Sequence, residues 1–191
     1  MISKQNNMNW TRKIWLIAII ITLHFPTASA QRTMSRQSSL GASARYNGTS
    51  VGAEAFYAQY TLGGFWETGL EGQDFNCPLS TGQTLRYIDA YARGGYQFRL
   101  VSRRSRSIGL YGGGGVFAGV ECTDPFRSVP SYISLGVPRW QFLYGVYGKL
   151  LTEVFIGRKV ALTVDASVPV NFSSKLSVLH WSAGLGIKVL L

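Results

Sequence analysis

Apolar and polar residues alternate along the last segment of the sequence, residues 177–191. The apolar positions are Leu179, Trp181, Ala183, Leu185, Ile187, Val189 and Leu191, and the residues between them are small or polar. A period of two predicts a β-strand with one apolar face. A closing strand of this length and pattern is typical of outer-membrane β-barrels, so we expect it to be the last strand of such a barrel.

Clusters of Gly, Ser and Asn divide the rest of the sequence into further segments of strand length. Eight segments are predicted, with approximate limits 39–46, 51–61, 64–75, 84–100, 107–121, 138–156, 159–172 and 177–191. An even number places both ends of the chain at the periplasm, with short turns there and longer loops outside, over 76–83 and 122–137. The sequence therefore predicts an all-β fold, an antiparallel transmembrane β-barrel of about eight strands with short periplasmic turns and longer outer loops.

Charged side chains share one parity within these segments, opposite the apolar residues. In 84–100, for example, Asp89 and Arg93 alternate with Ile88 and Ala90. A lipocalin-like soluble barrel would place apolar residues inside, so this pattern predicts a membrane barrel whose polar lumen is filled by its own side chains. The predicted luminal charge network comprises Arg45, Glu67, Glu71, Asp89, Arg93, Lys149, Glu153, Asp165 and Lys188.

Two segments fit this pattern less well. In 51–61, Glu54 shares a face with Phe56 and Tyr60, which leaves the orientation of the strand open. In 159–172, Pro169 removes one hydrogen bond from the ladder, which predicts a bulge near the outer rim.

Aromatic residues of the predicted outward face gather near the strand ends. They are Tyr46, Trp140, Phe142, Phe172 and Trp181 toward the outer surface, and Trp66, Tyr96 and Phe98 toward the periplasm. Rings with a polar edge favour the membrane interface, so this distribution predicts two aromatic girdles. The alternative is that aromatic residues simply have a high β-propensity.

The N-terminal residues predict export. Lys4, Arg12 and Lys13 precede an apolar run, 14–23, which leads to Ala30 through a small-residue site. This pattern predicts a Sec signal peptide over residues 1–30, cleaved after Ala30, and an outer-membrane barrel domain over residues 31–191. Of 19 basic residues, three belong to the signal peptide, which leaves 16 against 9 acidic residues and a net charge of +7.

Cys77 and Cys122 are the only cysteines, and both fall in predicted outer loops. Because the compartment is oxidising, a disulfide between them is one interpretation. Two free thiols, or a bond to another chain, are the alternatives. A single pair of cysteines lacks the ligands of a structural zinc site, and the sequence predicts no metal and no cofactor.

His180 is the one histidine outside the predicted signal peptide. A hydrolase would need a nucleophile such as Ser182 or Ser177 beside it, but nothing in the spacing brings a base and an orienting group together. The glycines at 112–115 lack the Lys-Ser/Thr pair of a phosphate loop and instead predict close approach of strands. We therefore expect no enzyme activity.

Arg103, Arg104 and Arg106 crowd one predicted periplasmic turn, and Arg158 and Lys159 lie at another. The simplest interpretation is a solvated turn that anchors the barrel at the lipid headgroups; the alternatives are an acidic partner protein and nucleic acid. Direct nucleic-acid contact is not expected, because no exposed aromatics alternate with the charges. The outer basic residues expected to meet lipopolysaccharide phosphates are Arg127, Arg139 and Lys175.

Several stretches together carry a resemblance to a known family. They are Ala30-Gln31, Asn76-Cys77-Pro78 with Gly82-Gln83, Tyr91-Ala92-Arg93-Gly94-Gly95-Tyr96, Gly119-Val120-Glu121 after the glycine run, and Ser182-Ala183-Gly184-Leu185-Gly186-Ile187. In these stretches, and over essentially the whole of residues 31–191, the chain resembles the TraO family of conjugative-transposon proteins from Bacteroidetes.

The resemblance implies a role in conjugal DNA transfer, as an accessory of the transfer apparatus in the outer membrane. It implies other transfer proteins as partners and brings no catalytic residues with it. An eight-stranded barrel is too narrow to pass a DNA strand, so the expected role is that of an anchor or docking protein. The alternatives are a general adhesion or envelope-integrity barrel and a lipid-modifying outer-membrane enzyme.

Overall fold

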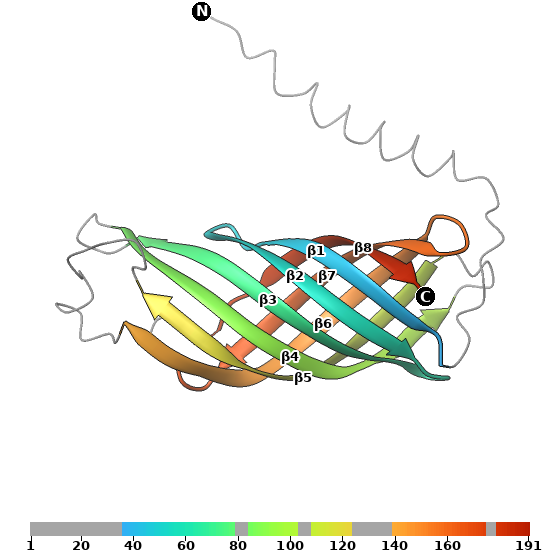
Figure 1. The fold of residues 1–191 in the computed structure, drawn as a ribbon, viewed down its shortest axis with the longest axis horizontal. Helices are drawn as coiled ribbons and strands as arrows, with labels where there is room; N and C mark the ends of the chain where they lie inside the picture. The colour runs from blue at the N-terminus through green and yellow to red at the C-terminus, as the bar shows by residue number, and fades with distance from the viewer. Residues whose placement is uncertain (1–35, 79–83, 103–107, 124–138, 175–178) are drawn as a thin grey trace, which may run out of the picture.

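Eight antiparallel strands close into one barrel, in which each strand pairs with its neighbours in sequence and the last pairs with the first (Figure 1). The computed structural model describes residues 36–78, 84–102, 108–123, 139–174 and 179–191. The strands are β1 (Ser38–Tyr46), β2 (Ser50–Tyr60), β3 (Gly64–Pro78), β4 (Thr84–Ser102), β5 (Ile108–Thr123), β6 (Trp140–Phe155), β7 (Val160–Asn171) and β8 (Ser182–Leu190). The predicted fold class is confirmed, and the predicted signal peptide, residues 1–30, lies outside the described residues.

The barrel is apolar outside and polar inside. In β8, Leu185 is 63% exposed on the outer wall, whereas Lys188 is fully buried in the lumen. A closed sheet satisfies every ladder hydrogen bond, so its wall can face lipid, and the period of two then sends the alternate residues inward. No helix among the described residues has the length and apolar character needed to cross a membrane.

The orientation of β2, which the sequence left open, follows from burial. Glu54, Phe56 and Tyr60 are all buried, while Val51 is 66% exposed. The mixed face of this strand therefore points inward as a whole. Tyr60 contributes to an apolar layer in the lumen, and the Glu54 carboxylate joins the charged residues beyond that layer.

The prediction of a bulge at Pro169 is wrong. Pro169 stays in register opposite Tyr147 of β6. On the other side, the β7–β8 ladder ends at Ser167 and resumes in the same register as an isolated bridge between Val170 and Leu179. The missing N–H thus interrupts the β7–β8 ladder without an inserted residue. As a result, β8 begins at Ser182, five residues later than the sequence pattern predicts. The one register shift among the strand pairs that the structure describes lies in β4, between Arg99 and Val101.

Tight turns at both ends use residues suited to left-handed backbone. Between β1 and β2, Gly48 has φ of +88°, and the side chain of Asn47 accepts hydrogen bonds from the backbone N–H groups of Thr49 and Ser50, at 3.0 and 2.7 Å. Between β6 and β7, Gly157 has φ of +98°. Such turns reverse the chain with few residues and hold neighbouring strands in register.

The outward aromatic residues lie at two levels of the wall. The terminal end of the barrel is the end at which β1 begins and β8 finishes. Near the opposite end, five outward aromatic residues are 57–63% exposed: Tyr46, Trp140, Phe142, Phe172 and Trp181. Near the terminal end, the ring of Tyr96 packs between Trp66 and Phe98, with centroid distances of 5.0 and 4.8 Å. This is the arrangement that the girdle interpretation requires.

We expect charge on the outer wall to destabilise the barrel according to depth. Leu185→Arg, in the middle of β8, should lower the free energy of unfolding by ~2–4 kcal/mol in a bilayer, because the guanidinium would face hydrocarbon. Leu62→Arg is the control, since Leu62 is 87% exposed in the β2–β3 turn and should tolerate the charge. Urea titration of barrels inserted in vesicles, followed by heat-dependent gel mobility, measures both. Equal losses would contradict the assigned lipid-facing surface.

Candidate functional site

The lumen is filled in layers, beginning at the end that carries the termini. There, buried apolar side chains pack into one cluster: Ala58, Tyr60, Phe65, Tyr111, Leu151, Phe155, Ala161 and Leu190. The rings of Tyr60 and Phe65 lie 5.2 Å apart, and those of Phe65 and Tyr111 lie 5.0 Å apart. This cluster closes the terminal end of the barrel with side chains.

A buried ion pair lies against this apolar layer. Lys188 of β8 pairs with Glu153 of β6, and the Tyr60 hydroxyl donates to both Glu153 oxygens, at 2.9 and 3.0 Å. The Lys188 ammonium also lies 4.2 Å from the centroid of the Phe65 ring. Aromatic faces and one carboxylate therefore replace water around this ammonium.

Phe56 separates this pair from the charges further along the lumen. Its ring lies 5.4 Å from the Nζ atoms of both Lys149 and Lys188. Gly41 of β1 makes room for the ring, because a Cβ at Gly41 would lie 2.3 Å from a ring carbon of Phe56. Gly41 was not among the residues predicted for the lumen, although a glycine on the inward parity of a strand is a signal of such close packing.

Two arginines share two carboxylates in the middle of the lumen. Arg45 contacts Glu54 at 2.5 Å and Glu71 at 2.9 Å. Arg93 uses the other oxygen of each carboxylate, pairing with Glu54 and lying 2.9 Å from Glu71. All four side chains are at most 2% exposed. Bridging geometry of this kind is what allows buried charges to be tolerated, since each carboxylate oxygen has a donor.

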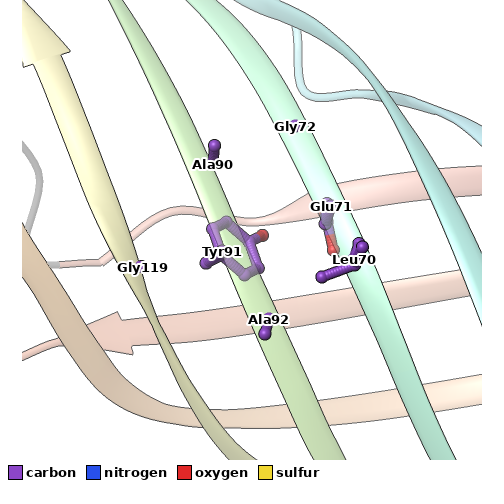
Figure 2. Close-up of a pocket in the computed structure, with 7 residues that line it drawn as sticks. All are labelled: Leu70, Glu71, Gly72, Ala90, Tyr91, Ala92 and Gly119. Atoms are coloured by element: carbon purple, nitrogen blue, oxygen red, sulfur yellow. The ribbon is translucent and has the colours of Figure 1, made fainter.

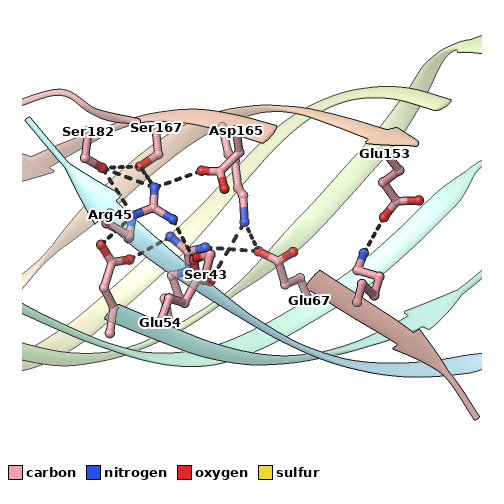
Figure 3. Close-up of polar contacts among 12 residues, drawn as sticks. Ser43, Arg45, Glu54, Glu67, Glu153, Asp165, Ser167 and Ser182 are labelled. Atoms are coloured by element: carbon pink, nitrogen blue, oxygen red, sulfur yellow. Dashed lines mark hydrogen bonds and ion pairs between the residues drawn. The ribbon is translucent and has the colours of Figure 1, made fainter. Parts of the chain in front are cut away.

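Further contacts extend this group to other strands (Figure 3). The Arg45 Nη2 atom lies 2.9 Å from Asp165 and donates to Ser167 at 2.5 Å and to Ser182 at 3.1 Å. On the other side, Glu67 accepts from Lys149 at 2.7 Å and lies 3.3 Å from Arg93.

Eight of the nine predicted network residues therefore lie in buried ion pairs: Arg45, Glu67, Glu71, Arg93, Lys149, Glu153, Asp165 and Lys188. The carboxylate of the ninth, Asp89, has no ion pair or hydrogen bond within the described part of the chain. Glu54, whose orientation the sequence left open because its strand carries apolar residues on the same face, is a further member of the network. Glu121 is a further buried carboxylate that was not predicted as luminal.

Among the interpretations left open for Cys77 and Cys122, the arrangement of the strands does not support a disulfide between the two. Cys122 is a free, buried thiol, and the side chain of Cys77 lies outside the described residues. Because β4 separates β3 from β5, the backbones at the two positions lie at least two strand spacings, or ~9 Å, apart. They are also offset along the strands, since Cys77 pairs with Leu85 of β4 and Cys122 with Ile88. A disulfide joins Cα atoms no more than ~7 Å apart. The periodicity of the sequence could not decide between these interpretations, because it does not give the register of the strands.

His180 and Ser182 do not form a nucleophile and base in this structure. The Ser182 hydroxyl is held by Arg45 and by Ser167 at 3.0 Å, and His180 packs edge-on against the Phe75 ring at 5.2 Å. Burial lowers the pKa of the His180 imidazole. Ser177 lies outside the described residues, among which no group of three or more His, Cys, Asp and Glu side chains is placed to hold a metal.

Basic side chains lie at the terminal rim. Arg36, Arg158 and Lys159 are exposed there, the last two in the β6–β7 turn, and Arg99 lies over the Tyr111 ring at 6.0 Å. Arg103, Arg104 and Arg106 lie outside the described residues. At the opposite end Arg139 is exposed, whereas Arg127 and Lys175 also lie outside the described residues.

Shallow apolar grooves run along the wall where the outward side chains are small. One lies beside Leu70, between Gly72 of β3 and the alanines Ala90 and Ala92 of β4 (Figure 2). Glu71 also lines it, but that carboxylate is held from inside by two arginines. The groove therefore offers an apolar surface without a free polar group for chemistry.

Solved structures share this fold at low sequence identity. The outer membrane protein OprG from Pseudomonas aeruginosa is 10% identical with a TM-score of 0.55, over 81% of this chain and 95% of that one. Neisserial surface protein A (NspA) is 11% identical with a TM-score of 0.51, over 80% and 94%. The N-terminal β-barrel domain of Pseudomonas aeruginosa OprF is 8% identical with a TM-score of 0.50, over 82% and 98%. These similarities establish the fold alone. No curated protein matches the sequence.

The family is established by the sequence itself. A family model described as "Conjugative transposon protein TraO" matches residues 66–191. This match extends from β3 through β8, and so contains most of the luminal network and the closing strand. It confirms the resemblance drawn from the sequence motifs. The chain belongs to the TraO family of conjugative transposon proteins.

Proposed function

We propose that this TraO-family protein is an outer-membrane anchor and docking component of the conjugal DNA transfer apparatus. The observation that carries the proposal is the filled lumen. The apolar cluster that contains Phe65 and Tyr111 occupies its terminal end, and the ion pairs of Arg45 and Arg93 occupy its middle. A barrel filled in this way is not the conduit for DNA, so its contribution comes from its rims and loops.

The outer membrane is the location that this wall fits. The outward residues are apolar over the body of the barrel, and aromatic rings lie toward both ends, as in outer-membrane barrels. At the end opposite the termini, exposed Arg139 is a candidate contact for lipopolysaccharide phosphates. The predicted signal peptide supports the same location, because a barrel must cross the inner membrane before it is inserted.

The basic rim is the surface that we assign to docking. Arg36, Arg158 and Lys159 are exposed at the end that carries the termini, which is the periplasmic end in single-chain outer-membrane barrels. Complementary charge steers association and sets the register of an interface. The partner that this rim fits is therefore an acidic surface on another transfer protein. We assign no catalytic role to the chain.

Removing a central arginine should destabilise the barrel strongly. We expect Arg93→Met to cost ~3–5 kcal/mol of unfolding free energy, because Glu54 and Glu71 would each lose a buried partner. Arg86→Met is the matched control, since Arg86 pairs with Asp74 on the surface, where its side chain is 45% exposed, and its loss should change stability little. Urea titration of folded barrels measures both variants. Equal losses would contradict the luminal network as the source of stability.

The filled lumen also predicts electrical behaviour. The wild-type barrel should show no steady conductance in planar bilayers, because side chains occupy its interior. A stable pore wide enough for a DNA strand would contradict the anchor role.

Mating assays test the proposed role directly. Deletion of the gene should lower the frequency of transfer, and the wild-type gene should restore it. We expect Arg158→Glu with Lys159→Glu to restore transfer at least about tenfold less well, since reversing two interface charges costs more than ~1.4 kcal/mol. Arg139→Glu, a charge reversal at the opposite rim, is the control and should restore transfer fully.

The amount of each variant in the outer membrane is compared first, so that failed insertion is distinguished from failed docking. Unchanged mating after deletion would contradict the proposal and favour a general adhesion or envelope-integrity barrel. A double variant that restores transfer fully would contradict the assignment of docking to this rim.

A further inference from the structure

Negative charge exceeds positive charge in the described part of the lumen. The buried carboxylates are Glu54, Glu67, Glu71, Asp89, Glu121, Glu153 and Asp165, and the buried basic side chains are Arg45, Arg93, Lys149 and Lys188. The basic side chains are all engaged with five of these carboxylates. Two carboxylates, on Asp89 and Glu121, therefore remain without a cation among the described residues.

These two carboxylates face each other. Asp89 of β4 is the direct partner of Glu121 of β5 in the ladder, and the two residues are 0% and 1% exposed. Side chains opposite each other in an antiparallel pair have Cβ atoms ~4.5–5.5 Å apart, so two like charges here repel. The next charged group near Asp89 is Glu71, which is also acidic.

Their oxygen atoms have almost no donors. Neither Asp89 oxygen has a hydrogen-bond partner, nor does Glu121 Oε1, while Glu121 Oε2 accepts from Ser174 at 2.8 Å. Gln73, opposite Asp89 on the other side of β4, turns its amide to Glu71 and accepts from Ser50 at 3.2 Å. An isolated buried carboxylate is costly, so this pair requires either a positive group or a proton.

Neutral oxygens adjoin the pair and are unpartnered as well. Thr123 is fully buried on the inward face of β5, one inward position beyond Glu121, and its Oγ1 has no hydrogen-bond partner. Gln141 of β6 is the ladder partner of Glu121 on the other side; its Nε2 donates to the Ser173 carbonyl, whereas its Oε1 is unpartnered. Carboxylate, amide and hydroxyl oxygens without a hydrogen-bond partner thus occupy neighbouring inward positions of β4, β5 and β6.

We propose that Asp89 and Glu121, with Gln141 and Thr123, bind one hard divalent cation of the Ca²⁺ type inside the barrel, level with the outer aromatic girdle. Ca²⁺ takes ~6–8 oxygen ligands from carboxylates, amide carbonyls and water. Two carboxylates and two neutral oxygens supply such a set, and the ion would remove the repulsion between the carboxylates. The set holds no nitrogen or sulfur ligand, which argues against a zinc site.

The level of the site in the barrel follows from the ladder. Glu121 pairs with Gln141, which directly follows the outward Trp140 of the girdle. Ser174, which donates to Glu121, belongs to the connection between β7 and β8. A bound cation would therefore join β4, β5 and β6 to this connection at the outer mouth of the barrel.

Calorimetric titration with Ca²⁺ alone tests the site. The full-length protein, purified from membranes in detergent and stripped with EDTA, should bind one Ca²⁺ with a dissociation constant below about 1 mM. The heat-induced change in gel mobility should move to higher temperature in the presence of Ca²⁺, because the ion binds only the folded barrel. Asp89→Asn and Glu121→Gln should each weaken binding at least about tenfold, and Thr123→Val should weaken it measurably.

Asp74→Asn is the control, because Asp74 is a surface carboxylate paired with Arg86, and binding should be unchanged. Absence of saturable Ca²⁺ binding to the wild type would overturn the proposal and favour a shared proton between the two carboxylates. Unchanged binding in the doubly substituted protein, Asp89→Asn with Glu121→Gln, would overturn it equally. If that protein does not fold, the wild-type titration and its thermal shift still decide the question.

Discussion

The interior of this barrel depends on two guanidinium groups that share two carboxylates. Arg45 and Arg93 each contact both Glu54 and Glu71, so that the four side chains from β1 to β4 form a closed ring of ion pairs. A planar guanidinium presents donors in several directions, which allows one arginine to serve two carboxylates without competition. Because water is largely excluded from the lumen, each of these four charged side chains depends on the other three for its partners. Asp165 extends the same group to β7, past the intervening β8.

The side of the wall on which each residue lies could be predicted from the sequence, because parity is a local property. Asp89 and Arg93 were assigned inward and lie there. The pairing across the lumen could not be predicted, since it depends on the stagger of strands around the closed sheet. This is why Asp89 appeared to be a network member although its facing partner is Glu121.

Prediction of the strand orientations was also limited where one face of a strand carries both apolar and charged residues. The inward face of β2 carries Phe56 and Tyr60 beside Glu54, because the lumen has an apolar layer at its terminal end. A rule that places only polar residues inside the barrel does not predict such an apolar layer. At Pro169, the missing donor was recognised correctly, but the loss of a hydrogen bond did not require an extra residue, and the register was kept.

The network also bears on how a docking rim would be supported in the proposed role. The turn that carries Arg158 and Lys159 joins β6 to β7. The two strands also carry Lys149, Glu153 and Asp165, which pair with Glu67 of β3, Lys188 of β8 and Arg45 of β1. A force applied at this turn is therefore resisted by charges across the lumen as well as by the ladder hydrogen bonds of adjacent strands. An open channel lined by solvated side chains would lack these ties, and so the filled lumen suits an anchor better than a conduit.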